Sequence, residues 1–169
     1  DFVIEGLATI PVRQRPALLL VGDYQESDER AFLEHLARQR GVEVDFRTMI
    51  GDEALVRLYS RAALTVYAPV SEPFGLVALE SMACGTPVVG VREGGVQETV
   101  VHGETGILVD RDPKAFGCAV RALLEDEALA RQYGAQARVC AVETWSWDRA
   151  IRELERHLAS VAGGMPKSS

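Results

Sequence analysis

Short apolar runs alternate with charged, amphipathic segments along most of the chain. The first run, residues 17–21, is continuous and ends at Gly22-Asp23, which is typical of a buried parallel strand, and three further short runs are mostly apolar. In a fifth, Val42, Val44 and Phe46 alternate with polar residues. The pattern therefore predicts strands at residues 17–21, 42–46, 64–68, 87–91 and 105–109.

The segments between the runs have helical spacing. Asp52 is a candidate N-cap for one helix, in which Leu55, Leu58 and Tyr59 pack inward, and Asp112-Pro113 opens another. A short helical segment is expected at 96–101. The longer predicted helices cover residues 1–10, 28–40, 53–61, 75–84, 113–125, 127–142 and 147–161.

Strands that alternate with helices form βαβ units. The sequence therefore predicts an α/β, three-layer, Rossmann-like domain over residues 1–162, with a mostly parallel sheet flanked by helices, and a disordered tail at 163–169. Ligands of such sheets bind beyond the carboxyl ends of the strands. The loops at 22–27, 69–75 and 92–95 should therefore converge on one crevice, which favours a nucleotide site.

The stretch from residue 71 to 90, SEPFGLVALESMACGTPVVG, contains the strongest candidate chemistry. Its apolar composition predicts a helix that is packed on most of its circumference. Gly75 leaves the backbone N–H groups at the helix start open to an anion. Glu72 and Glu80 flank this start, and ionised carboxylates accept hydrogen bonds from sugar hydroxyls. The alternative is that Glu80 pairs with an arginine in the core.

Composition narrows the function classes. The 169 residues carry a net charge of −7, which argues against nucleic acid or an anionic membrane as a partner. No apolar run is long enough to span a membrane. The three cysteines are scattered among apolar residues and are expected to be buried free thiols. The histidines show no zinc-ligand spacing, so no metal site is predicted.

The central stretch, followed by EGGVQETV and HGETGILVD, resembles the C-terminal, donor nucleotide-sugar-binding domain of GT-B glycosyltransferases. The similarity runs from residue 1 to about 160 and is closest to the retaining family 4 (group 1) enzymes. It implies one half of a GT-B fold. It also implies transfer of a sugar from a UDP-, GDP- or ADP-linked donor to an acceptor hydroxyl, with no metal and no cofactor.

The resemblance also implies roles for individual residues. Glu80 would bind the ribose hydroxyls of the donor and Glu72 the hydroxyls of its sugar. The backbone of Phe74, Gly75 and Leu76 would hold the sugar and the diphosphate. The remaining positions are the base-side loop, Arg47, Thr48, Met49 and Ile50, and the crevice turns at Gly22, Gly94 and Gly95.

Departures from the family pattern limit what the resemblance implies. Thr48 and Tyr24 stand where the family usually has glycine. The family's diphosphate-binding Arg and Lys precede its first helix and are not in this sequence, nor is the N-terminal acceptor-binding domain. We nominate no catalytic residue and expect the isolated chain to be inactive. The parent should be cytoplasmic, with a membrane-peripheral location as the alternative.

Other functions remain open on sequence grounds. A nucleotide-sugar epimerase and a non-catalytic nucleotide-sugar-binding module would share these features. A phosphorylase is disfavoured, because neither Lys114 nor Lys167 is placed to hold its cofactor. Trp145 and Trp147 are interpreted as a packing anchor before the last helix rather than a sugar platform.

Overall fold

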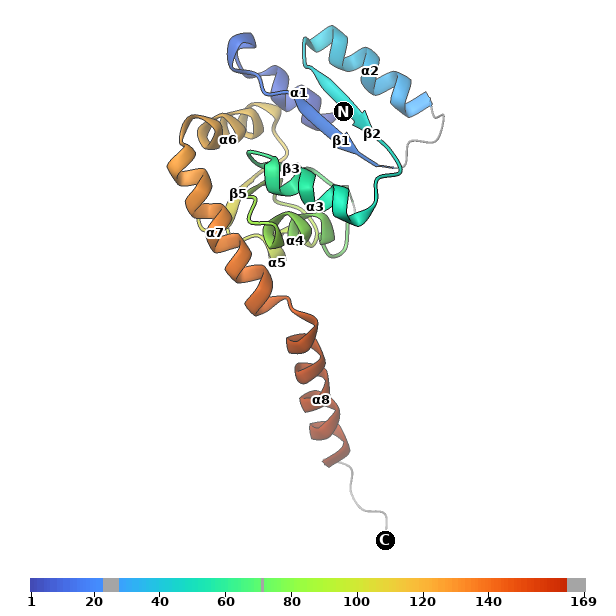
Figure 1. The fold of residues 1–169 in the computed structure, drawn as a ribbon, viewed down its shortest axis with the longest axis vertical. Coiled ribbons are helices and arrows are strands. Elements are labelled where there is room, and N and C mark those ends of the chain that lie inside the picture. The colour runs from blue at the N-terminus through green and yellow to red at the C-terminus, as the bar shows by residue number, and fades with distance from the viewer. Residues whose placement is uncertain (23–27, 71, 164–169) are drawn as a thin grey trace.

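The computed structural model describes residues 1–22, 28–70 and 72–163, and Figure 1 shows the course of the chain. Every predicted strand and helix is present. In chain order they are α1 (Phe2–Ala8), the 3-10 turn η1 (Val12–Gln14), β1 (Leu18–Val21), α2 (Asp28–Arg40), β2 (Val44–Arg47), α3 (Asp52–Arg61), β3 (Thr65–Tyr67), α4 (Leu76–Ala83), β4 (Val88–Val91), α5 (Val96–Thr99), β5 (Gly106–Val109), α6 (Pro113–Glu125), α7 (Glu127–Thr144) and α8 (Trp147–Gly163).

Most predicted boundaries shift by one or two residues, and two of these shifts correct a predicted cap and the predicted tail. Asp52 is the first residue of α3 and not its cap, because Gly51 holds the extended backbone of the N-cap position. Helix α8 continues to Gly163, where the tail was predicted to begin, and residues 164–169 lie outside the described residues. The cap at Asp112 is confirmed, since its Oδ2 accepts the Ala115 N–H at 2.8 Å.

All the paired strands are parallel, which confirms the predicted α/β class. Strand β4 lies between β3 and β5 and separates two cores. Val89 and Val91 point into a core formed largely by α1, α2 and α6. Val88 points into a core formed with α4, α5 and α7. Helices therefore cover both faces of the sheet, as a three-layer domain requires.

The strands form two sheets rather than the single one expected. One sheet has the order β1-β2 and the other β3-β4-β5. A cavity of about 520 Å³ lies between β1 and β3, lined mainly by apolar residues of these strands and of α1, α3 and α6. The amides of Leu18 and Gly22 donate to the β2 side, so by strand alternation the backbone groups of Leu19 and Val21 face this cavity. In the described ranges, no strand pairs with that edge of β1.

Arg15, in the segment between α1 and β1, holds the ends of α1 and α2 together. Its guanidinium donates to the carbonyl oxygens of Ala8 at 2.6 Å and Ile10 at 2.7 Å, and also to those of Arg40 and Gly41. These carbonyls belong to the ends of α1 and α2, where backbone acceptors lack helical partners. Arg15 is thus a structural cap for two helices.

Helix α8 runs away from the body of the molecule (Figure 1). Its apolar side chains are exposed and recur at alternating intervals of four and three residues, at Trp147, Ile151, Leu154, Leu158 and Val161. Among the described helices, none is both long and apolar enough to cross a membrane.

The cysteines are free, but they are less buried than predicted. Cys118 is exposed, and Cys84 and Cys140 are half-buried. Cys118 lies on the solvent side of α6, whose inward positions are taken by Phe116, Ala119 and Val120. An apolar sequence neighbourhood did not indicate which face of the helix the thiol occupies.

Candidate functional site

The loops that follow β3 and β4 are in direct contact. The Gly95 N–H donates to the Glu72 carbonyl oxygen at 3.1 Å. A methyl group on Gly95 would lie 2.5 Å from the Phe74 carbonyl oxygen, and one on Gly94 would collide with the Glu72 carbonyl. Only glycine allows backbones to approach this closely. The structure thus brings together two of the loops that the sequence placed at one crevice.

Helix α4 begins next to this contact with open backbone donors. Gly75 is its N-cap, with a φ of 84°, a conformation that favours glycine. The Gly75 N–H donates to Glu72 Oε1 at 3.2 Å. Among the described residues, no hydrogen bond uses the amides of Phe74, Leu76 or Val77. These amides stand at the positive end of the helix dipole, where an anion is stabilised.

The prediction that α4 is packed on most of its circumference is wrong. Ala78, Ser81 and Met82 are buried, whereas the face with Leu76 and Glu80 is exposed. Because these two residues are four apart, they lie one turn apart on the same face. Glu80 does not pair with an arginine in the core. Its Oε2 accepts a hydrogen bond from the Tyr59 hydroxyl at 3.2 Å.

Two tyrosines lie close enough to Glu72 and Glu80 for the charges of these carboxylates to affect the tyrosine pKa values. Burial raises the pKa of Tyr59, and the charge and hydrogen bond of Glu80 raise it further. Burial also raises the pKa of Tyr67, with added contributions from the charges of Glu72 and Glu80. Both hydroxyls therefore remain protonated donors at neutral pH. Glu72 and Glu80 thus act on one neighbourhood, although they belong to a loop and a helix.

Sequence reasoning did not include these tyrosines in the site. Tyr59 was expected only to pack inward from α3, and Tyr67 was part of a predicted strand. Tyr67 is the last residue of β3, directly before the loop that carries Glu72. The sequence signal that could have identified Tyr67 is a side-chain hydroxyl at the carboxyl end of a predicted parallel strand, where ligands bind.

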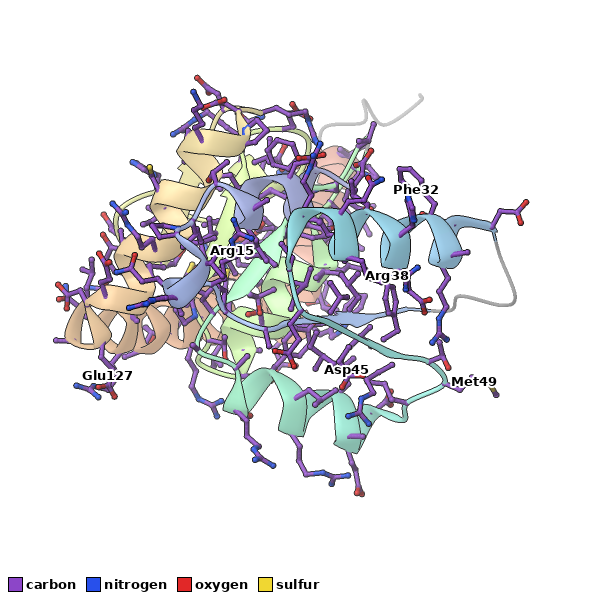
Figure 2. The ribbon with its side chains drawn as sticks, turned by 90° about the horizontal axis from the view of Figure 1, so that it is seen from above. Arg15, Phe32, Arg38, Asp45, Met49 and Glu127 are labelled. Atoms are coloured by element: carbon purple, nitrogen blue, oxygen red, sulfur yellow. The ribbon has the colours of Figure 1, made fainter. Side chains whose placement is uncertain are left out.

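The base-side loop lies at the carboxyl end of β2. The Gly22 N–H donates to the Arg47 carbonyl oxygen at 3.1 Å, so two more of the predicted residues are brought together. The Arg47 guanidinium pairs with Asp45 at 2.8 Å. Met49 has a φ of 51°, is 93% exposed and points away from the body (Figure 2). Tyr24, which was expected to narrow this approach, lies outside the described residues.

The predicted site residues therefore form two groups. Gly22 and the loop 47–50 belong to the β1-β2 sheet, and residues 72–80 with Gly94 and Gly95 to the β3-β4-β5 sheet. The cavity between β1 and β3 separates the groups and is lined by Val21, Tyr59 and Val77. Both groups lie at carboxyl ends of parallel strands.

Arg111 links the loops around the second group, which contains residues 72–80, Gly94 and Gly95. Its guanidinium donates to both carboxylate oxygens of Glu93 and, at 2.6 Å, to the Pro69 carbonyl oxygen. It also lies over the Phe2 ring, 5.1 Å from its centroid. The hydrogen bonds from Arg111 hold the pKa of the Glu93 carboxyl below its usual range. One side chain thus connects the loops that follow β3, β4 and β5.

Over residues 1–22, 28–70 and 72–163, no group of three or more His, Cys, Asp and Glu side chains could hold a metal ion. The chemical resources of the site are carboxylate acceptors, tyrosine hydroxyls and free backbone amides. Such a set suits a ligand that carries both an anionic group and several hydroxyls.

The fold and the position of the site define a Rossmann-like α/β domain of the GT-B type. Residues 1–139 match the family of glycosyl transferases group 1, and the chain belongs to that family. It is 38% identical over 162 residues to D-inositol 3-phosphate glycosyltransferase of Corynebacterium diphtheriae, covering 90% of this chain and 36% of that protein.

Two solved structures show the likeness in three dimensions. Sucrose-phosphate synthase of Thermosynechococcus elongatus superposes with a TM-score of 0.80 at 36% identity, over 95% of this chain and 42% of that one. Anabaena HepE in complex with UDP-glucose superposes with a TM-score of 0.81 at 26% identity, over 94% of this chain and 44% of that one. The chain therefore spans less than half the length of these relatives.

Proposed function

We propose that this chain is the C-terminal, donor-binding part of a retaining glycosyltransferase, and that it binds a nucleotide-diphospho-sugar at the start of α4. The whole protein would transfer the sugar to an acceptor hydroxyl. One observation carries the proposal: the open backbone amides at the N-terminus of α4 lie beside Glu72, which accepts the Gly75 N–H, and one turn before Glu80 on the exposed face of the helix.

The diphosphate would occupy the N-terminus of α4. As the bond to the sugar breaks, negative charge grows on the diphosphate, and fixed amide dipoles stabilise that charge without rearranging. The amides of Leu76 and Val77 stand open for this purpose, whereas the Gly75 N–H is held by Glu72. When Glu72 turns to accept hydroxyls of the donor sugar, it releases this amide to the phosphate.

Glu80 would accept the ribose hydroxyls from the exposed face of α4. Its carboxylate is oriented by the Tyr59 hydroxyl, which leaves further acceptor sites free for a ligand. The backbone of residues 47–50 would contact the base, and Gly94 and Gly95 would bound the crevice. The chemistry requires no metal and no cofactor from this chain, and we assign no general base to it.

Binding is tested by amide NMR with UDP, GDP and ADP and their glucose, mannose and N-acetylglucosamine derivatives. We expect one nucleotide class to perturb the amides of residues 74–77, with a Kd on the order of 0.1–1 mM. Turnover by the 169-residue chain alone is not expected, because the longer relatives contain more than this domain.

Glu80→Ala is the test variant and Glu104→Ala its control, since Glu104 is an exposed carboxylate next to the amino end of β5. Glu80→Ala should weaken binding about tenfold or more, because it removes charged acceptors for two hydroxyls. Glu104→Ala should leave the Kd unchanged. The proposal fails if tens of millimolar ligand shifts no amide in residues 74–77.

A further inference from the structure

Phe74 lies in the loop of residues 72–75, here called the donor loop, and is contacted from two sides. Its backbone lies against Gly95, where a methyl group would fall 2.5 Å from the Phe74 carbonyl oxygen. Its ring meets the ring of Trp145 edge-on, with centroids 5.5 Å apart and planes at 84°. Edge-on aromatic pairs are attractive because the positive edge of one ring faces the negative face of the other. The turn before α5 and the end of α7 therefore contact this residue from two sides, although its side chain remains 41% exposed.

Trp145 belongs to the end of a helix that is fixed to α4. It is the C-cap of α7, and its N–H donates to the Ala141 carbonyl oxygen at 3.2 Å. Helix α7 is fixed to α4, because Arg138 donates to the Ala83 carbonyl oxygen at 2.5 Å. Ala137 of α7 is fully buried in the same core as Met82 of α4. Helix α7 is thus anchored to the C-terminal end of α4 through Arg138. The Trp145 ring at the end of α7 contacts Phe74, in the loop that precedes the N-terminal end of α4.

The second tryptophan provides the contrast. Trp147 begins α8, is 83% exposed and lies only two residues further along the chain. The sequence suggested that both tryptophans form a packing anchor before the last helix. In the structure, Trp145 contacts the donor loop and Trp147 faces solvent.

We propose that Trp145 is a positioning residue for the donor loop. By bracing the Phe74 ring, it holds the backbone of residues 72–75 in the form that presents the amides of α4 to the diphosphate. This inference rests on the proposed function. It adds that donor affinity depends on Trp145, at the junction between α7 and α8, which lies 71 residues after Phe74 in the chain.

The first test needs no ligand. The amides of Gly75 and Gly95 both donate to Glu72, so their hydrogen exchange reports whether the loop keeps its form. Trp145→Ala should speed this exchange about 3- to 10-fold, the range expected from loss of one aromatic pair. Trp145→Phe should restore it to within about twofold, since a smaller ring can make the same contact. Trp147→Ala, the matched control, should leave both amides unchanged.

The second test measures affinity. The chain contains 2 tryptophans, so Trp147→Phe leaves Trp145 as the single one. The fluorescence of Trp145 then reports on the loop during titration with UDP-glucose and UDP. The Kd for UDP-glucose should rise about 3- to 10-fold in Trp145→Ala, measured by amide NMR, and recover in Trp145→Phe. Thermal unfolding of each variant shows that the comparison is made on folded protein.

The outcomes separate the two proposals. Unchanged exchange at Gly75 and Gly95 in Trp145→Ala overturns the positioning role, whatever the ligand data show. Faster exchange with an unchanged Kd also overturns it, since the loop would then not govern binding. If the wild-type chain binds neither UDP nor UDP-glucose, the proposed function fails for these ligands, while the exchange data still decide whether Trp145 holds the loop.

Discussion

The two sheets differ in how completely they are enclosed. In β4, the side chains of Val88, Val89 and Val91 are fully buried, because helices pack on both faces and strands lie on both sides. In β1, Leu19 and Val21 are 38% and 39% exposed, and one edge borders the cavity. We therefore expect the β3-β4-β5 sheet to be the rigid half of the domain, and the β1-β2 sheet to be the open half.

The loops at the carboxyl ends follow the same division. Those beyond the β3-β4-β5 sheet are joined by the Gly95 to Glu72 hydrogen bond, by Arg111 and by Trp145. The loop beyond β2 carries Met49, whose backbone is left-handed and whose side chain is 93% exposed. Preorganised contacts lower the entropic cost of binding. We expect the rigid half to hold the sugar and diphosphate, and the open half to adjust to the base.

The largest effect should come from a methyl group in the rigid half. Gly95→Ala would force backbone against the Phe74 carbonyl, and we expect a loss of about 3 kcal/mol in the free energy of unfolding. Gly51→Ala in the open half meets no atom within 4 Å and should cost only about 0.5 kcal/mol. Urea unfolding measures both. Equal losses would mean that the two halves are not packed differently.

A smaller difference in the free energy of unfolding is expected between alanine substitutions of two valines, one in each sheet. Val89→Ala removes buried methyl groups from β4 and should cost about 2 kcal/mol, from lost burial plus the cavity left behind. Val21→Ala in β1 removes groups that are partly in water already, so we expect about 0.5 kcal/mol. Urea midpoints at constant slope give both values. A Val21→Ala loss as large as that of Val89→Ala would show that β1 is enclosed in solution.

The smallest effects should come from two ion pairs, one at the carboxyl-end loops of the β3-β4-β5 sheet and one between α1 and α2. Glu93 pairs with Arg111, and Glu5 with Arg40, and in each case the arginine lowers the carboxyl pKa below its usual value of 4.5. A lowered folded-state pKa adds stability above pH 4.5 that is lost as the pH falls through the folded value. Glu93→Gln and Glu5→Gln should therefore lower the urea midpoint at pH 7 and have less effect in more acidic solution.

The two variants should differ in what else they change. Glu93→Gln weakens the brace that holds the Pro69 carbonyl, so it should also shift the amides of residues 72–75 in NMR spectra. Glu5→Gln weakens a link between α1 and α2 and should leave those amides unchanged. A shift of the loop amides in Glu5→Gln would contradict the expectation that, of these two ion pairs, only the one with Arg111 holds the loop.

The sequence by itself determined the order and type of the helices and strands, because side-chain periodicity and caps such as Asp112 act over a few residues. It also predicted that loops at the carboxyl ends of parallel strands meet, which Glu72 and Gly95 do. Gly75 was identified as an open helix start from its neighbours alone, and it is the N-cap of α4.

Only the tertiary structure decided which distant residues meet. The hydrogen-bond partner of Glu80 is Tyr59, 21 residues away in the chain. Trp145, at the end of α7, contacts the ring of Phe74 in the loop before α4. The exposed face of α4 and the separation of β1 from β3 depend on which elements come to lie beside them. Periodicity shows that a face is apolar, but only packing in three dimensions determines what covers it.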